Sequence, residues 1–447
     1  MSHARHQHLH QFVLFARDHV FMNSHDTTDL QIDHLERYGR RLRIAVVTET
    51  YPPEVNGVSL TLSQLVANLI ERQHSIQLVR LRQPGDVWAG LPTGAALARH
   101  GEAANTEAPI LMRGIPIPRY PGLRMGLPCK GSLVKLWSVR RPDVVHIATE
   151  GPLGWSALKA AQQLKLPVSS DFRTNFHAYS RHYGVGVLFR SIMLVLRKFH
   201  NRTHLTLVPT PALKTQLEAA GFKRLAVVGR GVDAGLFHPD RRSPSLRAQW
   251  GLRPDSLAVV YMGRLASEKN LPLVVSAFEA IAQQRPDARL VLIGDGPLRA
   301  ALQAQCPRAI FTGMLRGNYL AQALASTDLF LFPSETETYG NVVVEAMASG
   351  VPTVAYRMAA AAELIQSGIN GWTAEPGKAN EFIQAALDAA RDDVHRNVVA
   401  RRCAADIQGL DWSTVTQQFE RALLRLVDEQ QRLSMAGISL PSWGAQS

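Results

Sequence analysis

The sequence has few cysteines, no long apolar run and no short motif of the kinds that mark many cofactor or metal sites. Its three cysteines, Cys129, Cys306 and Cys403, lie far apart, and none belongs to a C-x-x-C pair. This excludes a disulfide framework and a cysteine zinc site, and it fits a protein of the reducing cytosol. No stretch approaches the ~18 to 20 apolar residues that span a bilayer, so a cytoplasmic protein is expected.

Residues 1–40 lack clear periodicity and begin with a stretch rich in histidine. A short apolar patch at 12–16 follows these histidines, without a lysine-rich start and without an evident cleavage site, which argues against a signal peptide. We expect residues 1–40 to form a mobile extension before a folded part that begins at Arg41. Alternatively, the true start lies further in, for instance at Met22.

A glycine-rich dinucleotide fingerprint is also missing. Residues 42–48 predict a buried strand, 49–58 a loop and 59–72 an amphipathic helix, which together form the opening unit of a doubly wound domain. The loop holds the single glycine Gly57 and no G-x-G-x-x-G, so a nicotinamide oxidoreductase is disfavoured and no cofactor is expected. The chain has no Asp-x-Asp for a metal on a diphosphate, and no metal is expected.

Positive charge is concentrated in the N-terminal half. Residues 1–230 carry 29 lysines and arginines against 15 acids, whereas residues 231–447 carry 20 against 22. Such a half is suited to anionic partners, including acidic lipid headgroups and phosphorylated acceptors, unless it is simply a solvated basic face. No nucleic-acid-binding motif is present, so nucleic acid is not an expected partner.

Strand and helix patterns alternate along the chain, which predicts an α/β protein with two consecutive doubly wound parallel sheets. We expect Rossmann-like domains at 41–224 and 225–412, the second opening with a strand, and a helix within 413–447 that crosses back to the first domain. The polar stretch 240–256 is expected to be a linker or surface insert. The irregular stretch 84–130 is expected to be an acceptor loop or a partly disordered segment.

Residues 333–355 predict the end of a strand, a tight loop and a short helix over 341–349. Gly340 allows a backbone to approach a ligand closely, and the free N–H groups of a helix start bind anions. Glu337 lies just before the helix, and Glu345 lies one turn inside it. Carboxylates are poor phosphate ligands but accept hydrogen bonds from hydroxyls. The pattern indicates a nucleotide sugar; the alternative is that both acids are solvated helix-end charges.

A second constellation, Gly263-Arg264-x4-Lys269, follows another predicted strand. Arginine can fork onto phosphate oxygens, and lysine adds a point charge. Fixed cations of this kind stabilise the charge that develops on a leaving diphosphate without a metal. The alternative is a surface salt bridge with Glu268.

The text ETETYGNVVVEAMASGVPTVA resembles the E-x7-E signature of the family 4 retaining glycosyltransferases of the GT-B fold, with Glu337 and Glu345 as its acids. The resemblance covers roughly residues 41–430. It implies two Rossmann-like domains that face a central cleft, with the acceptor in the first domain and the nucleotide sugar in the second.

The resemblance also implies residue roles. Arg264 and Lys269 are expected to clamp the diphosphate, Glu345 to bind the ribose hydroxyls, and Glu337 to hold the donor sugar. The loop of Gly294 and Asp295 is expected near the nucleobase. The implied donor site comprises Gly57, Gly263, Arg264, Lys269, Gly294, Asp295, Glu337, Thr338, Tyr339, Gly340, Asn341 and Glu345.

The N-terminal text is similar to one subgroup, the α-mannosyltransferase and sulfoquinovosyltransferase-like lipid glycosyltransferases. The matching segments are 48–53, 56–58, 146–152 and 229–233. The first hypothesis is a retaining, metal-independent transfer of a hexosyl group, mannosyl from GDP-mannose, to a hydroxyl of a glycolipid at the inner face of the membrane. A UDP-sugar-dependent glucosyl or uronosyl transferase is the near competitor. A non-catalytic nucleotide-binding or membrane scaffold of the same fold is the alternative from another class.

One position departs from many relatives, which carry a histidine where this chain has Arg173. Arginine cannot act as a base, but it can hydrogen-bond the sugar or the β-phosphate; His146, His177 or His182 could take over a histidine role. The predicted catalytic residues are Arg173, Arg264, Lys269 and Glu337. The candidates for the acceptor site or for supporting positions are Asn56, Arg124, His146, Glu150, Asn175 and His177.

A basic helix is expected at 185–204, where apolar residues are surrounded by arginine and lysine. A helix at a membrane surface has this pattern. A core helix with one solvated basic face has it too, and both interpretations stay open.

Overall fold

The computed structural model describes residues 40–436, except 55, 84–85, 87–107, 118–123, 174–185, 336 and 338. Contacts divide the chain into Met1–Arg40 and Arg41–Ser447, and every described helix and strand belongs to the second unit. The predicted mobile extension therefore lies almost wholly outside the described residues.

The first sheet has seven parallel strands in the order β3-β2-β1-β6-β7-β8-β9. They are β1 (Arg43–Thr48), β2 (Ser75–Leu81), β3 (Ile110–Met112), β6 (Val144–Ile147), β7 (Val168–Asp171), β8 (Leu205–Val208) and β9 (Leu225–Val227). The short strands β4 (Gly114–Pro116) and β5 (Arg124–Gly126) form a separate antiparallel ribbon. Central strands such as β1 are buried on both faces, because helices cover both sides of a parallel sheet.

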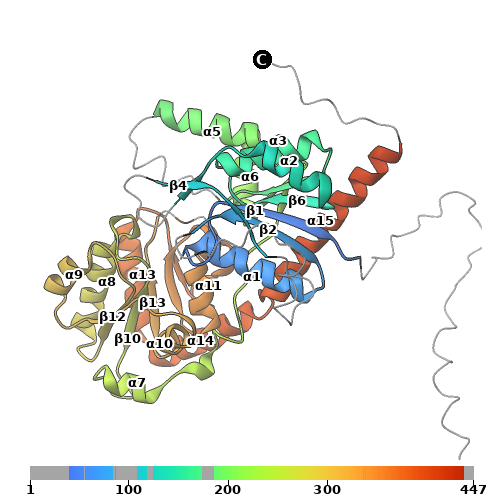
Figure 1. Cartoon of the computed structure of the whole chain (residues 1–447). Coiled ribbons are helices and arrows are strands. Elements are labelled where there is room, and N and C mark those ends of the chain that lie inside the picture. Colours follow the sequence, from blue (N-terminus) through green and yellow to red (C-terminus); the bar gives the residue numbers. More distant parts are fainter. Residues whose placement is uncertain are drawn as a thin grey trace, which may run out of the picture. The chain divides into compact units, whose positions relative to one another are not determined.

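Successive residues of β1 point to opposite faces of this sheet and contact different helices. Ile44 and Val46 share a core with α1 (Gly57–Glu71) and α15 (Trp412–Met435), whereas Ala45 and Val47 share one with α2 (Lys130–Val139) and α3 (Pro152–Gln163). Figure 1 shows α5 (Gly186–His200) and α6 (Pro211–Ala219) on the same side as α2 and α3.

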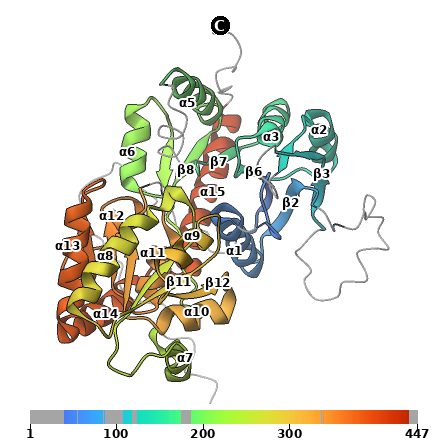
Figure 2. The same ribbon diagram turned by 90° about the vertical axis from the view of Figure 1, so that its left-hand side faces the viewer.

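Helix α15 lies beside α1 (Figure 2) and contributes its apolar residues to the first core. Phe419 and Leu423 are fully buried there. Glu420 of α15 accepts hydrogen bonds from Arg72 at 2.7 Å and lies 3.0 Å from His74 Nε2. The last helix of the described residues thus completes the core around β1.

The second sheet has six parallel strands in the order β12-β11-β10-β13-β14-β15. They are β10 (Ala258–Met262), β11 (Arg289–Ile293), β12 (Ile310–Gly313), β13 (Leu329–Phe332), β14 (Thr353–Tyr356) and β15 (Trp372–Ala374). In Figure 1 one face carries α8 (Leu271–Gln284), α9 (Arg299–Gln305) and α13 (Ala379–Arg391), and the other α10 (Gly317–Ala325), α11 (Asn341–Ala348) and α14 (Asp393–Ile407). The short helices are η1 (Pro239–Arg241), α7 (Pro244–Gln249), η2 (Ser267–Lys269) and α12 (Ala359–Leu364). Two parallel sheets covered by helices confirm the predicted fold class.

The strand at 225–227 belongs to the first sheet, where β9 pairs with β8. The expectation that it opens the second domain is wrong on this point, because alternation of helix and strand does not reveal which sheet an edge strand joins. The stretch 240–256 is more than a loose linker. Its Arg247 is buried and donates to Asp328 at 2.9 Å, at the start of β13.

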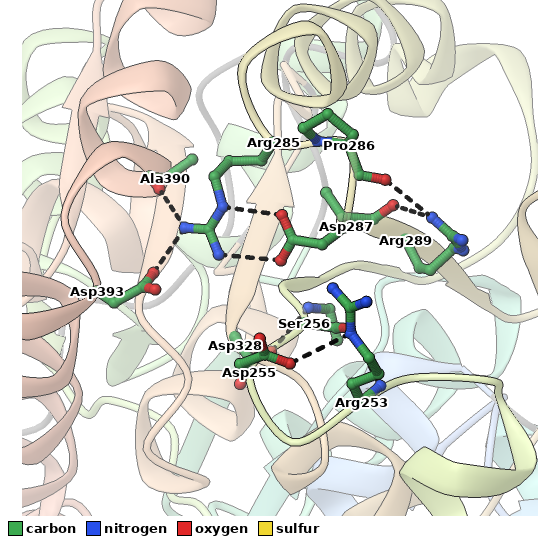
Figure 3. Close-up of polar contacts among 12 residues, drawn as sticks. Arg253, Asp255, Ser256, Arg285, Pro286, Asp287, Arg289, Asp328, Ala390 and Asp393 are labelled. Atoms are coloured by element: carbon green, nitrogen blue, oxygen red, sulfur yellow. Dashed lines mark hydrogen bonds and ion pairs between the residues drawn. The ribbon is translucent and has the colours of Figure 1, made fainter.

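A second arginine ties distant elements of the same sheet together (Figure 3). Arg285, at the end of α8, forms two 3.1 Å hydrogen bonds with Asp287 before β11, and one of 2.8 Å with Asp393 at the start of α14. The arginine hydrogen bonds hold the pKa of Asp287 below its usual value. Charged hydrogen bonds of this kind fix α8 against the α13–α14 junction.

Candidate active site

The loop between β13 and α11 ends at Gly340, whose φ of +88° lies in the left-handed region that favours glycine. Helix α11 then runs over Asn341–Ala348, as the sequence predicts. Gly340 has no side chain to cap this end, and no other described residue accepts a hydrogen bond from Asn341 N or Val342 N, so these two N–H groups are available to an anion.

Glu337 on this loop forms an ion pair with Lys269, which comes from the end of η2. Its Oε1 also accepts a 2.8 Å hydrogen bond from Ser334. The Lys269 Nζ lies 5.8 Å from the centroid of the Phe332 ring, and the side chains of Lys269 and Glu337 are 20 % and 16 % exposed. The structure thus joins the two motifs of the sequence, and Lys269 does not pair with Glu268.

Arg264 differs from Lys269 in its surroundings. Its side chain is 66 % exposed, and its nearest carboxylate is that of Glu268 at 3.9 Å, as the salt-bridge alternative expects. Next to it, Gly263 and Gly294 directly follow the adjacent strands β10 and β11. A Cβ on Gly294 would lie 2.0 Å from the Gly263 carbonyl oxygen, so the two strand ends approach each other at a distance that only glycine allows.

Asp295 holds the loop that follows β11. Its carboxylate accepts from Gly296 N at 2.8 Å and from Arg299 at 3.0 Å, and its carbonyl accepts from Leu265 N at 2.9 Å. The predicted nucleobase loop therefore lies against the loop that carries Arg264.

Glu345 lies on the second turn of α11 and is half-buried. Within the described part of the chain, no group donates a hydrogen bond to its carboxylate, and burial raises its pKa to about 7. An acid at a helix start with so little compensation is typical of a binding site, and hydroxyl donors from a ligand would satisfy it.

On the first sheet, Asn56 caps α1 and does not point into open space. Its Oδ1 accepts from Val58 N at 3.1 Å and from Ser59 N at 2.9 Å, and its Nδ2 donates to Thr50 at 2.6 Å. Gly57 is the first residue of this helix.

Asp171, Arg173 and His146 form a buried cluster at the end of β7. The Asp171 carboxylate accepts from Arg173 Nε at 2.7 Å and lies 3.3 Å from His146 Nε2. Burial acts to raise the pKa of Asp171, but the charges of Arg173 and His146 bring it well below its usual range. His146 is fully buried against Ser169 and Phe419, so it orients Asp171 from behind.

Two further candidates have partners within the first half. Glu150 lies 3.2 Å from His200 Nε2, and Arg124 donates to the Gly114 carbonyl at 2.6 Å in the antiparallel ribbon. Thr338, Asn175 and His177, with His182, lie outside the described residues.

Arg230, which follows β9, is a site residue that the sequence alone does not reveal. It is 6 % exposed, donates to Asn341 Oδ1 at 3.3 Å and lies 5.6 Å from the centroid of the Tyr339 ring. Burial lowers its pKa to about 9, so it stays cationic at neutral pH. The only sequence signal was its place between Gly229 and Gly231 in a segment of the resemblance.

Residues 55–236 match a family model described as Glycosyltransferase Family 4, and residues 256–392 match one described as Glycosyl transferases group 1. A GDP-mannose-dependent alpha-mannosyltransferase of Corynebacterium glutamicum is 30% identical over 422 residues, covering 91% of this chain and 96% of the relative. The protein of the same name from Mycolicibacterium smegmatis is 35% identical over 320 residues, 70% and 79% of the two chains. A sulfoquinovosyl transferase of Arabidopsis thaliana is 31% identical over 313 residues, covering 68% of this chain and 61% of the relative.

Among solved structures, Anabaena HepE in complex with UDP has a TM-score of 0.67 at 21% identity, covering 86% of this chain and all of that one. Sucrose-phosphate synthase of Thermosynechococcus elongatus has a TM-score of 0.68 at 18% identity, covering 87% and 100%. Both likenesses concern the fold. From its two parallel sheets and its relatives, the chain belongs to the family 4 glycosyltransferases and is a glycosyltransferase of the GT-B fold.

Proposed function

We propose that this enzyme transfers a mannosyl group from GDP-mannose to a hydroxyl of a lipid or glycolipid acceptor, with retention of configuration and without a metal. The observation that carries the proposal is the Lys269–Glu337 ion pair, in which Glu337 lies on the loop before α11, the helix that carries the Glu345 carboxylate. Relatives named as GDP-mannose-dependent alpha-mannosyltransferases support the choice of donor. UDP-sugar use is the competing donor choice, because the neighbouring fold of HepE was solved with UDP-glucose.

In this proposal Glu345 accepts hydrogen bonds from the ribose hydroxyls, and Glu337 accepts them from the sugar. Lys269 is oriented by Glu337 before the ligand arrives, so its charge is in place when the leaving diphosphate becomes more negative. Arg264, which is largely exposed, closes onto the same phosphates. Arg173 hydrogen-bonds the sugar or the β-phosphate.

The acceptor hydroxyl is the nucleophile. Its oxygen forms the new bond to the anomeric carbon, the bond from that carbon to the β-phosphate oxygen breaks, and the hydroxyl proton passes to the leaving phosphate on the same face. Arginine cannot take this proton. Asp171 is a weak base, because the charges of Arg173 and His146 outweigh burial and hold its pKa well below its usual range. The leaving phosphate is therefore the base in this scheme.

A lipid acceptor is supported by α5. Its Met193 and Leu196 pack inward, but Leu194 and Val195 are 55 % and 53 % exposed, and Arg190 and Lys198 flank them on the exposed surface. The expected core face is thus present, yet the outward face is both apolar and basic. None of the helices in the described part of the chain is long and apolar enough to cross a bilayer. We propose that α5 lies on an anionic membrane surface and brings the site to its acceptor.

A thermal-shift panel of GDP, UDP, ADP and their sugar conjugates tests the donor. A ligand at a hundredfold excess over its dissociation constant stabilises by about 2.7 kcal/mol, and we expect GDP and GDP-mannose to give this shift. If only uridine nucleotides raise the unfolding temperature, the donor is a UDP-sugar and not GDP-mannose. If no nucleotide raises it, the non-catalytic scaffold alternative is favoured. Turnover of GDP-mannose on vesicles that contain glycolipid then tests the acceptor.

A further inference from the structure

Arg230 is held in place from behind by the start of α15. A Cβ on Gly231 would lie 2.8 Å from the Trp412 Cα, so the two backbones touch at a glycine. Val232 pairs with Asp411 in an isolated bridge, and its N–H donates to Leu410 at 2.9 Å. The backbone around Arg230 is thereby fixed between the first sheet and the last helix.

The guanidinium of Arg230 lies between the starts of two helices. Its NH1 is 3.3 Å from Asn341 Oδ1 at the start of α11, and it is 3.7 Å from the position of a Cβ on Gly57 at the start of α1. Tyr339 holds the same arginine through its ring and through a 3.3 Å hydrogen bond from its hydroxyl to the Arg230 carbonyl. Two helix N-termini and one cation therefore converge, and each favours an anion.

The charge of Arg230 is poorly compensated within the described residues. Its side chain makes one hydrogen bond there, to a neutral amide, and no carboxylate lies within ion-pair distance in this part of the chain. The charges of Asp171 and Glu337 act on Arg230 at longer range and raise its pKa, whereas the charge of Arg173 lowers it. Asp171 is bound to Arg173 and His146, and Glu337 to Lys269. A buried guanidinium with five donors and one neutral partner calls for an anionic ligand.

We propose that Arg230 binds an oxygen of the donor's diphosphate, as a third cation beside Arg264 and Lys269 and the one supplied by the first-sheet segment. The inference rests on the proposed nucleotide-sugar site. Diphosphate is favoured over the phosphate of an acceptor lipid because Tyr339, Asn341 and Glu337, the neighbours of Arg230, all belong to the donor loop.

The competing explanation is a purely structural role, here called a latch, in which Arg230 only joins the first-sheet part of the chain to the second through its contact with Tyr339. A latch would stabilise the unliganded protein, and its loss would weaken all ligands alike. A phosphate ligand makes a different contribution, because its loss affects only ligands that carry the diphosphate.

The test compares the full-length protein with Arg230→Met, Arg230→Lys and the control Arg253→Met, which removes an arginine that is 71 % exposed. Calorimetric titrations with GDP and with guanosine are combined with unfolding temperatures without ligand. We expect Arg230→Met to weaken GDP by about tenfold or more, with guanosine affinity and unfolding temperature essentially unchanged. Arg230→Lys should recover part of the loss, and Arg253→Met should behave as the wild type.

Each other outcome overturns the inference. Unchanged GDP affinity in Arg230→Met, with a wild type that binds GDP, removes Arg230 from the diphosphate site and leaves the proposed function standing. Equal losses for GDP and guanosine with a lower unfolding temperature establish the latch. If Arg230→Met changes only the KM for the acceptor, Arg230 binds the phosphate of the acceptor lipid and not the donor's diphosphate. A wild type that binds no nucleoside diphosphate refutes the proposed function and the inference together.

Discussion

Glu345 and Lys269 illustrate two different ways in which a single residue prepares a site for a ligand. Glu345 is left without a donor in the described chain, and burial raises the pKa of its carboxyl to about 7. Lys269 is instead held by Glu337 next to the Phe332 ring. Burying the Glu345 carboxylate costs desolvation free energy, which hydrogen bonds from ligand hydroxyls would offset. The Lys269 side chain is already oriented before the ligand binds.

Replacing Glu345 by glutamine should weaken nucleotide binding and raise the free energy of unfolding of the protein without ligand. Losing the carboxylate acceptor leaves ribose hydroxyls poorly paired, which costs about 1 to 3 kcal/mol of binding free energy. Because the folded pKa of about 7 exceeds the ordinary 4.5, the penalty for burying the charge is full above pH 7 and vanishes below pH 4.5. The variant should therefore gain up to about 3 kcal/mol of unfolding free energy at pH 8 and nearly none at pH 4.

Urea unfolding at both pH values and titration with GDP measure these effects. Glu279→Gln, at an exposed acid on α8, is the matched control and should change neither quantity. Nucleotide affinity equal to that of the wild type would refute the role of Glu345.

Replacing Lys269 by methionine should lower kcat by about 10²- to 10³-fold, the usual effect of removing one preorganised group from a site of charge development. The change also leaves Glu337 without its cation, which destabilises the fold. The double variant Lys269→Met/Glu337→Gln removes both charges and should recover the stability but not the rate. Steady-state kinetics with GDP-mannose, beside thermal unfolding, separate the two effects, and a wild-type rate in either variant contradicts the phosphate clamp.

At the scale of elements, the outward face of α5 combines exposed Leu194 and Val195 with basic residues. Leu194→Glu should weaken binding to anionic vesicles, because it replaces an inserting apolar group by a repelled charge. Vesicle co-sedimentation at low and high salt is the measurement, with nucleotide affinity expected to stay unchanged. Val139→Glu, at a residue of α2 that is 86 % exposed, is the control; equal losses in both variants would show that α5 is not the docking element.

The Arg285 network joins α8, β11 and α14 in the second half of the chain (Figure 3). Arg285→Met should cost about 1 kcal/mol of unfolding free energy at pH 7, since it removes charged hydrogen bonds to Asp287 and Asp393, whose side chains are 19 % and 50 % exposed, and solvent screens such pairs. The pKa of Asp287 is lowered in the fold, so this contribution is present above pH 4 and is lost as the pH falls through the lowered value. Urea unfolding at pH 7 and pH 3 checks the sign: a variant deficit that is as large at pH 3 as at pH 7 would contradict the ionic origin.

At the scale of the whole molecule, the sequence predicts the two parallel sheets, α11 and the position of the Glu337–Glu345 and Arg264–Lys269 motifs at strand ends. Local patterns suffice for these, since strands, glycine turns and helix starts are encoded by neighbouring residues. The pairing of Lys269 with Glu337 cannot be predicted from the sequence, because 68 residues separate them and spacing alone does not reveal which loops meet.

The same limit explains the other differences. An edge strand such as β9 carries no signal for the sheet that it joins, and Asn56 in a loop gives no sign that its amide will cap α1. The burial of Arg230 has no local sequence signal, because the residues that its side chain contacts, Tyr339 and Asn341, are distant in the sequence. The residue type alone does not determine whether an arginine side chain is buried or exposed to solvent.

Because α15 completes the core of the first sheet, that core cannot form fully until the C-terminal part of the chain has been synthesised. Phe419, Leu423, Leu426 and Val427 close the core around β1, but residues 228–411 leave the ribosome between β9 and that helix. At about 5 to 20 residues per second this interval lasts roughly 10 to 40 s. For that time the apolar residues that α15 contacts in the finished fold are exposed on the nascent chain, although α1 can already cover part of the same sheet face. The part of the protein that is made first is finished last, so the growing chain is a natural client for chaperones that shield apolar surface until translation ends.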